Sequence, residues 1–252
     1  MGNFYVKDEG GNLYGTAKDR RNDFVLQQAE RLGVDKLVLI TSGNSGYSFA
    51  KLADGTGIQI VCIIDRQLPT AFKVRLQQVS YHVIEVNLQH KILRTEEVIS
   101  FAREKEDEVI WDVTNGYEES YGSIVQELRS LSPQYIVVPV GSGELFTGVA
   151  EAVNRQKLTT KVIGIGVQNT SGSLADKLFT PWTPYARYMR TFENRGHSIY
   201  RLSEKEVADT YKKYQHIVSC EVSSSVVFAA IQQHGFTKED KVVFVNSARA
   251  SQ

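Results

Sequence analysis

A lysine near the start of the sequence has surroundings suited to imine chemistry. Lys18 lies in Gly15-Thr16-Ala17-Lys18-Asp19-Arg20, a short glycine-led turn that runs into a stretch of helical periodicity. The N–H groups and dipole of a helix start disfavour a second positive charge, so a lysine there loses its proton more readily than a surface lysine. The neutral amine is the form that attacks a carbonyl compound to give a Schiff base. Because most lysines at helix starts are solvated surface groups, Lys18 becomes a candidate only together with two later turns.

The first of these turns is Gly141-Ser142-Gly143, which follows an apolar run and precedes a helical stretch. Glycines let backbone N–H groups point at an anion without a Cβ in the way, and the hydroxyls of Ser142 and Thr147 add donors. Phe146 stands where a dinucleotide-binding GxGxxG turn needs glycine, and no Gly-Lys-Ser/Thr of a Walker loop follows. The turn is a candidate phosphate site, and a plain strand-to-helix connection is the alternative.

The second turn, Thr41-Ser42-Gly43-Asn44-Ser45-Gly46, offers hydroxyls, an amide and two glycines between a strand-like and a helix-like stretch. Such donors suit a carboxylate or a ring oxygen of a ligand. The alternative is a purely local role, in which Ser42 or Asn44 caps the helix that follows.

Short, nearly continuous apolar runs recur along the chain, which is typical of parallel strands covered on both faces. They predict strands over 36–40, 58–64, 82–86, 135–140, 161–165 and 241–245. Helical periodicity predicts helices over 23–32, 47–53, 98–105, 121–131, 145–153, 204–214 and 222–233. The alternation predicts an α/β fold with parallel strands, whose ligands gather at the carboxyl ends of the strands. We therefore expect the segments after Ile40, Val140 and Val245 to share one edge of a sheet.

Composition limits the partners that the chain can bind. The 252 residues include 29 basic and 29 acidic side chains, and this zero net charge argues against nucleic acid or an anionic membrane surface as a partner. No apolar run approaches the length of about 20 residues that spans a bilayer. Two cysteines without a CxxC spacing and scattered histidines indicate neither a disulfide framework nor a metal site. We expect a cytoplasmic protein.

Taken in order, the motifs resemble those of fold-type II pyridoxal-phosphate enzymes, the family of cysteine synthase, threonine synthase and serine/threonine dehydratase. Residues 15–20 are similar to the family's Gly-Ser-x-Lys-Asp-Arg, and residues 41–46 to the Thr-Ser-Gly-Asn-Thr-Gly loop of cysteine synthases. Residues 139–148 resemble the glycine loop that holds the cofactor phosphate, and residues 220–225 the late Glu-x-Ser-Ser-Ala segment. The resemblance covers nearly the whole chain.

The resemblance implies a tryptophan synthase β-like fold of two parallel-sheet α/β subdomains with the site between them. A smaller subdomain over 34–105 would carry the Thr41–Gly46 loop. A larger one, formed by 1–33 and 106–252, would carry Lys18 and the phosphate-binding loop.

The resemblance also assigns a role to each candidate residue. Lys18 would form the imine with pyridoxal 5'-phosphate and move protons at the substrate α- and β-carbons, and Asn44 would bond the cofactor's ring oxygen. Ser247 would face the pyridine nitrogen, where a hydroxyl leaves that nitrogen largely unprotonated and favours β-elimination over transamination. The phosphate would be bound by Gly141, Ser142, Gly143 and Leu145, and the substrate carboxylate by Thr41, Ser42, Gly43 and Ser45.

The implied activity is a synthase of the cysteine- or threonine-synthase type, which performs β- or γ-elimination and replacement on a small amino acid with an activated leaving group. A homodimer is expected. The alternatives are a serine/threonine dehydratase-type ammonia lyase and a catalytically reduced binding or regulatory protein. Glu144 motivates the last, because it stands where the family has glycine or threonine and brings a carboxylate beside the phosphate position.

Overall fold

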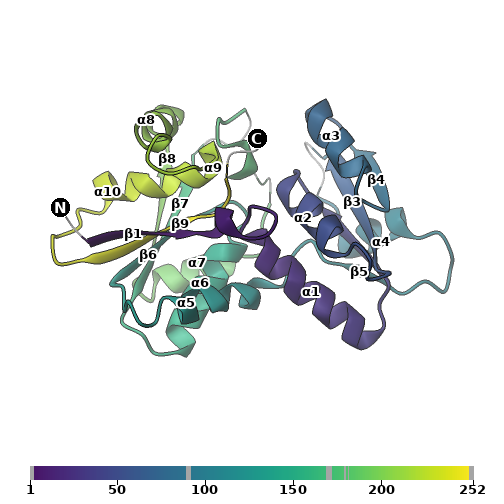
Figure 1. Cartoon of the computed structure of the whole chain (residues 1–252), viewed down its shortest axis with the longest axis horizontal. Helices are drawn as coiled ribbons and strands as arrows, with labels where there is room; N and C mark the ends of the chain where they lie inside the picture. Colours follow the sequence, from purple (N-terminus) through teal and green to yellow (C-terminus); the bar gives the residue numbers. More distant parts are fainter. Residues whose placement is uncertain (1–2, 89–91, 169–171, 179, 181, 250–252) are drawn as a thin grey trace. The chain divides into compact units, whose positions relative to one another are not determined.

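The computed structural model describes residues 3–88, 92–168, 172–178, 180 and 182–249. The chain divides into two compact units, drawn in Figure 1. Unit 1 comprises Met1–Ala17 and Glu118–Gln252, and unit 2 comprises Lys18–Tyr117. Each unit is built on its own parallel sheet.

Unit 1 contains a five-stranded sheet in the order β1-β9-β6-β7-β8, with every neighbouring pair parallel. Helices cover both faces, α5, α6 and α7 on one and α8, α9 and α10 on the other (Figure 1). The strands are β1 (Asn3–Asp8), β6 (Tyr135–Pro139), β7 (Lys161–Val167), β8 (Ser198–Leu202) and β9 (Lys241–Asn246). The helices are α5 (Gly122–Glu127), α6 (Glu144–Arg155), α7 (Ala186–Glu193), α8 (Glu204–Tyr214), α9 (Val222–Ser225) and α10 (Ala230–Gln233), with 3-10 turns η1 (Glu9–Gly11), η2 (Glu118–Tyr121), η3 (Asp176–Leu178) and η4 (Val226–Ala229).

Unit 2 contains a four-stranded parallel sheet in the order β4-β3-β2-β5. Helices α1, α2 and α3 share a core with one face of this sheet, and α4 packs on the other face. The strands are β2 (Lys36–Ile40), β3 (Gln59–Asp65), β4 (His82–Val86) and β5 (Ile110–Asp112). The helices are α1 (Lys18–Leu32), α2 (Asn44–Leu52), α3 (Thr70–Gln77) and α4 (Thr95–Ala102).

The apolar runs form central strands because both of their faces are buried. In β2, Leu37 and Leu39 pack with α1 and α2, while Val38 packs with α4. In β6, Val138 belongs to the core under α5–α7, and Val137 belongs to the core under α8 and η4. Side chains alternate between the faces of a strand, so a doubly covered strand needs apolar residues at every position. The predicted α/β fold with two parallel-sheet subdomains is confirmed.

One expectation about the strand ends is wrong. The segments after β6 and β9 lie at the same edge of one sheet, since these strands pair side by side. The segment after Ile40 does not share that edge, because β2 pairs with β3 and β5 in the sheet of unit 2. The expected smaller subdomain, 34–105, lies within unit 2, which also includes α1 and β5.

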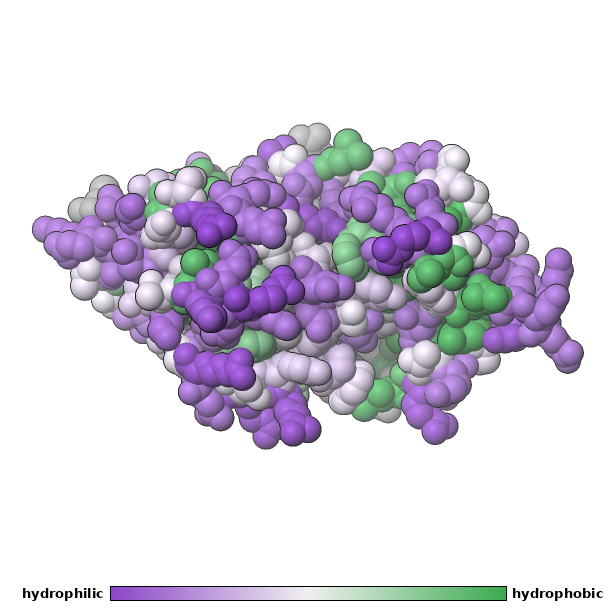
Figure 2. Space-filling model, turned by 90° about the horizontal axis from the view of Figure 1, so that it is seen from below, coloured by the Kyte–Doolittle hydropathy of each residue, from purple (hydrophilic) through white to green (hydrophobic). Residues whose placement is uncertain are grey.

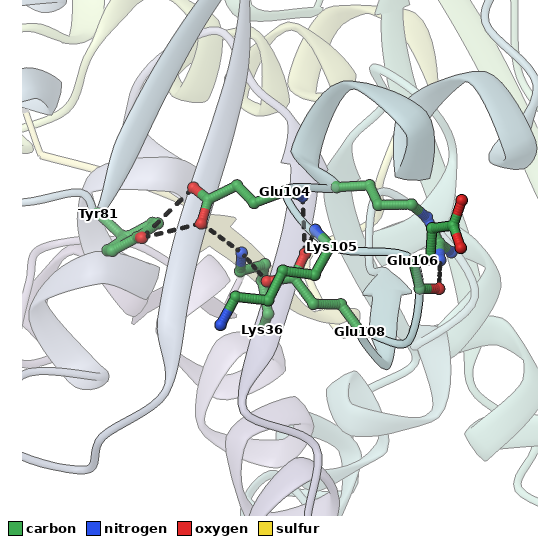
Figure 3. Close-up of polar contacts among 7 residues, drawn as sticks. Lys36, Tyr81, Glu104, Lys105, Glu106 and Glu108 are labelled. Carbon is green, nitrogen blue, oxygen red and sulfur yellow. Dashed lines mark hydrogen bonds and ion pairs between the residues drawn. The ribbon is translucent and has the colours of Figure 1, made fainter.

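A cluster of charges fixes the amino end of the unit 2 sheet (Figure 3). The Nζ of Lys36, the first residue of β2, lies 2.8 Å from Glu108 and 3.4 Å from Glu104. Glu108 also accepts the backbone N–H groups of Glu104 and Lys105, and the Tyr81 hydroxyl lies 3.3 Å from both Glu104 carboxylate oxygens. Burial opposes the charge on Lys36, but its bonds to Glu108 and Glu104 outweigh burial and raise its pKa.

Hydrophilic residues cover most of the face drawn in Figure 2, and hydrophobic residues form smaller groups between them. No helix in the described part of the chain combines the length and the apolar character needed to cross a membrane.

Candidate active site

Lys18 is the first residue of α1 and is half-buried. The turn before it is fastened to the segment that follows β9. Ala17 donates its N–H to the Ser247 carbonyl at 2.7 Å, Thr16 forms an antiparallel bridge with Ala248, and Arg249 donates to the Gly15 carbonyl. Ala17, the residue directly before Lys18, is therefore hydrogen-bonded to Ser247. The candidates Lys18 and Ser247 are thus connected through this hydrogen bond and the peptide bond between Ala17 and Lys18.

The first turns of α1 are joined to α2 by a buried polar network. Ser48 in α2 donates its hydroxyl to Asp19 at 2.6 Å, and the Asn22 amide donates to Ser48 Oγ and to the Ser45 carbonyl, both at 3.0 Å. Asp19, Asn22 and Ser48 are all buried. Buried polar groups that satisfy one another resist displacement, so the network holds the start of α1 against the Thr41–Gly46 loop.

The Thr41–Gly46 loop is shaped by a threonine. Thr41 Oγ1 accepts the N–H groups of Gly43 at 3.2 Å and Gly46 at 3.0 Å, and thus supplies the oxygen that caps the start of α2. Gly43 is the N-cap residue, with a φ of 137° that favours glycine. Ser42 is exposed, whereas Asn44 and Ser45 are half-buried. The capping role that was the alternative for Ser42 or Asn44 is performed by the Thr41 hydroxyl.

The Gly141–Gly143 turn requires glycine at 143 and leaves little room for a side chain at 141. Gly143 has a φ of 94° and precedes α6, and a Cβ there would lie 2.7 Å from the sulfur of Met189. A Cβ on Gly141 would lie 3.3 Å from the Leu178 backbone. Thr183 donates its hydroxyl to the Ser142 carbonyl and so holds the turn in place. At the start of α6, Glu144 donates its N–H to Ser142 Oγ and Thr147 donates its N–H to the Gly143 carbonyl, which leaves the N–H groups of Leu145 and Phe146 to serve an anion.

Two side chains in the first turn of α6 test whether a phosphate fits. Thr147 Oγ1 is buried and has no hydrogen-bond partner among the residues that the structure describes, which suits an anion that would accept its proton. Glu144 is only 2% exposed, so its carboxylate is buried and is not turned toward water. The backbone and hydroxyl donors therefore fit a phosphate, and Glu144 adds a negative charge to the same helix start.

Ser247 directly follows β9 and is half-buried. Its Oγ lies 2.8 Å from Oγ of Ser224 in α9, and Ser224 Oγ also accepts the N–H of Ala248 at 2.9 Å. Because β9 pairs with β6, Ser247 and the Gly141–Gly143 turn lie at the same edge of the unit 1 sheet.

The sequence motifs did not assign a role to four residues in these networks, Asp19, Asn22, Ser48 and Ser224. Asp19 and Ser224 lie inside the recognised motifs, but their partners come from distant parts of the chain. For Asn22 the sequence offers one signal, a polar residue one turn before the apolar Val25 and Leu26, whereas Ser48 has mostly polar neighbours one turn away and carries no such signal.

Residues 1–248 match the sequence family described as pyridoxal-phosphate dependent enzyme. No curated protein sequence matches the chain. Among solved structures, it is similar to a pyridoxal 5'-phosphate-dependent aspartate racemase, with 16% identity, a TM-score of 0.82, and coverage of 99% of this chain and 84% of the racemase.

Two further solved structures have comparable similarity. An O-acetylserine dependent cystathionine beta-synthase from Helicobacter pylori has 18% identity and a TM-score of 0.80, over 99% of this chain and 88% of that one. Threonine deaminase isoform 2 from Solanum lycopersicum has 16% identity and a TM-score of 0.77, over 100% of this chain and 76% of that one. At these identities the similarity establishes the fold.

The fold and the family match define a fold-type II pyridoxal-phosphate enzyme. The chain belongs to the family of pyridoxal-phosphate dependent enzymes, and its cofactor is pyridoxal 5'-phosphate.

Proposed function

We propose that this enzyme is a synthase that performs β- or γ-elimination and replacement on a small amino acid with an activated leaving group. The observation that carries the proposal is the neutral hydroxyl of Ser247 at the end of β9, the position that faces the ring nitrogen in the family it resembles. A hydroxyl leaves that nitrogen largely unprotonated, unlike a carboxylate. The weaker electron sink favours elimination and replacement over transamination.

The bound cofactor would supply the electron sink that stabilises negative charge at the substrate α-carbon. Lys18 would bond to it through Nζ and then take and return the protons at the α- and β-carbons, as a general base and acid. Asn44 would donate to the ring oxygen. The turn at Gly141, Ser142, Gly143 and Leu145 would bind the phosphate, and Thr41, Ser42, Gly43 and Ser45 would orient the substrate carboxylate.

The Thr41–Gly46 loop supports a synthase, because its sequence is similar to that of cysteine synthases. One structural relative is an O-acetylserine dependent synthase. O-acetylserine carries an activated leaving group of the class that we propose for the substrate of this chain. A dehydratase that releases ammonia and a keto acid is the second candidate, supported by the similarity to a threonine deaminase. The buried Glu144 supports the third, a binding or regulatory protein with reduced catalysis.

Replacement of the lysine tests the proposal directly. The purified protein should bind pyridoxal phosphate and absorb visible light, and the Lys18→Ala variant should lose this absorbance. Lys205→Ala is the matched control, because Lys205 is 87% exposed on α8 and pairs only with Asp209 among the described residues. A wild-type protein that stays colourless with added cofactor would overturn the proposal.

The leaving group is identified by adding O-acetylserine, O-phosphoserine, O-phosphohomoserine and serine in turn and recording the change in the visible spectrum. A new amino acid formed only when a nucleophile is added supports the synthase. Keto acid released from serine or threonine without a nucleophile supports the dehydratase instead. Spectral change with none of the four compounds would favour the binding protein.

A further inference from the structure

Ser247 does not stand alone at the end of β9, because a second, fully buried hydroxyl contacts it. Ser224 is 0% exposed, and its Oγ lies 2.8 Å from Ser247 Oγ and 2.9 Å from the backbone nitrogen of Ala248. The side chain of Ser224 therefore contacts both the residue proposed to face the cofactor's ring nitrogen and the residue after it.

The direction of the hydrogen bond between the two hydroxyls follows from the number of donors and acceptors. A serine hydroxyl has one proton and two lone pairs. The Ala248 N–H can only donate, so it occupies one lone pair of Ser224 Oγ. Among the described residues, Ser247 is then the one acceptor that Ser224 Oγ contacts. A buried hydroxyl proton without an acceptor costs about 1–3 kcal/mol, so Ser224 donates to Ser247.

The proton of Ser247 is consequently directed elsewhere. Ser247 Oγ accepts from Ser224, and no other described side chain or backbone group bonds to it. Unlike Ser224, Ser247 is half-buried, so its hydroxyl can reach a ligand. We propose that Ser224 is a positioning residue that makes Ser247 a hydrogen-bond donor toward the cofactor's ring nitrogen and so keeps that nitrogen unprotonated. The inference rests on the proposed function, which assigns Ser247 to the ring nitrogen.

The backbone around the two serines is held on several sides, so the hydroxyl torsions are the main freedom that remains. The Ser247 carbonyl accepts from Ala17, and the Ala248 carbonyl accepts from Glu221 at 3.2 Å. Thr16 bridges to Ala248. Removal of the Ser224 hydroxyl would let the Ser247 proton turn away from the ligand, while the bonds from Ala17 and Glu221 still hold the backbone after the Ala248 N–H loses its acceptor.

Ser224→Ala is the decisive variant, and Ser225→Ala is its matched control. Ser225 is the next residue of α9 and is also 0% exposed, but its hydroxyl donates to the Val222 carbonyl at 2.8 Å and does not contact Ser247. Both variants delete one buried hydroxyl from the same helix. An effect of Ser224→Ala beyond that of Ser225→Ala reports the loss of two contacts, the one with Ser247 and the one with the Ala248 N–H, and the Ser247→Ala background separates them.

The experiment uses cofactor labelled with 15N in the ring and records its NMR chemical shift and its dissociation constant in each variant. We expect Ser224→Ala to move the 15N shift away from that of the wild type and to weaken cofactor binding about three- to tenfold. Ser225→Ala should leave the shift unchanged. In a Ser247→Ala background, Ser224→Ala should add no further change of shift, since the two serines act as one unit.

Each outcome decides between the inference and the function on which it rests. An unchanged 15N shift and affinity in Ser224→Ala overturns the inference and leaves the proposed function standing. A wild type that binds no cofactor overturns both. If Ser224→Ala does not fold, Ser224→Cys replaces it, because a thiol is a weaker donor of similar size and should give a smaller change of the same sign.

Discussion

Glu144 is buried and is the first residue of α6, the helix whose start would bind the cofactor phosphate. Like charges repel strongly where water is excluded, whereas a carboxylate at a helix start stabilises the helix by about 0.3–1 kcal/mol. We predict that Glu144→Gln binds pyridoxal phosphate about tenfold more tightly, equivalent to about 1.4 kcal/mol, and that its melting temperature without cofactor falls.

Spectrophotometric titration with the cofactor measures the first effect, and calorimetry of the cofactor-free protein measures the second. Glu151→Gln is the control, because Glu151 is an exposed residue of the same helix. Equal cofactor affinity in Glu144→Gln and wild type would show that Glu144 does not oppose the phosphate.

At the residue scale, the sequence identifies groups by type and spacing but not by partner. The glycines of the 141–143 turn could be predicted, because their backbone requirement is local, and the structure gives Gly143 a φ of 94°. The bond of Ser224 to Ser247 and that of Ser48 to Asp19 could not, since each joins segments more than twenty residues apart through the fold. The roles of Lys18 and Ser247 toward the cofactor stay predictions.

The packing of α1 on α2 depends on one buried serine. Ser48→Ala would leave the Asp19 carboxylate and the Asn22 amide without a shared partner, and we expect the free energy of unfolding to fall by about 2 kcal/mol. Urea denaturation measures this loss. Ser100→Ala is the control, because the Ser100 hydroxyl is exposed and, among the residues that the structure describes, bonds only to the Glu97 carbonyl within α4. A loss no larger than that of the control contradicts the role of the network.

The charge cluster at the amino ends of β2 and β5 predicts how stability depends on acid. The hydrogen bond from Lys36, together with the backbone N–H groups of Glu104 and Lys105, lowers the pKa of Glu108 to about 2, from an ordinary value near 4.5. The folded carboxylate binds protons less readily than the unfolded one. Its stabilisation is therefore complete above about pH 4.5 and is lost as the pH falls toward 2.

Glu108→Gln removes this dependence, so the wild type should exceed the variant in urea midpoint at pH 6, and the difference should shrink below pH 4.5. Glu106→Gln serves as the control, because its exposed carboxylate points away from Lys36 in Figure 3. A constant difference between wild type and Glu108→Gln from pH 6 to pH 3 would contradict the assignment.

Elements with a strong pattern could be predicted, and elements that depend on neighbours could not. The predicted strands at 36–40 and 82–86 and the predicted helix at 204–214 coincide with β2, β4 and α8. Three strands and two helices had no expected counterpart. β1 is mostly exposed, β5 has three residues, and α3 buries only Leu76, so none shows a clear apolar period. β8 likewise buries only Leu202, whereas α7 does carry an apolar period, with Met189 and Phe192 buried on one face, which we did not predict from the sequence.

At the scale of the whole molecule, the two units differ in continuity. Unit 2 is one continuous segment with its own sheet and two apolar cores. Unit 1 is formed by two segments, because β1 precedes unit 2 in the sequence and the other strands of its sheet follow it. We predict that a fragment of residues 18–117 unfolds cooperatively in urea, while a fragment of residues 118–249 does not, because β9 loses its neighbour β1. Circular dichroism and amide hydrogen exchange measure both. A fragment of 18–117 without protected amides would contradict the independence of unit 2.

The pairing of β1 with β9 also sets the order in which the protein becomes able to work during synthesis. β1 is translated long before β9, the strand with which it pairs in the described part of the chain. Until β9 is made, the aromatic side chains of Phe4 and Tyr5 lie on an unpaired strand, which exposes them to factors that bind nascent chains. Lys18 is translated long before the Ser247 segment to which the turn before Lys18 is hydrogen-bonded. We therefore expect the nascent chain to bind the cofactor only after Ser247 has been synthesised.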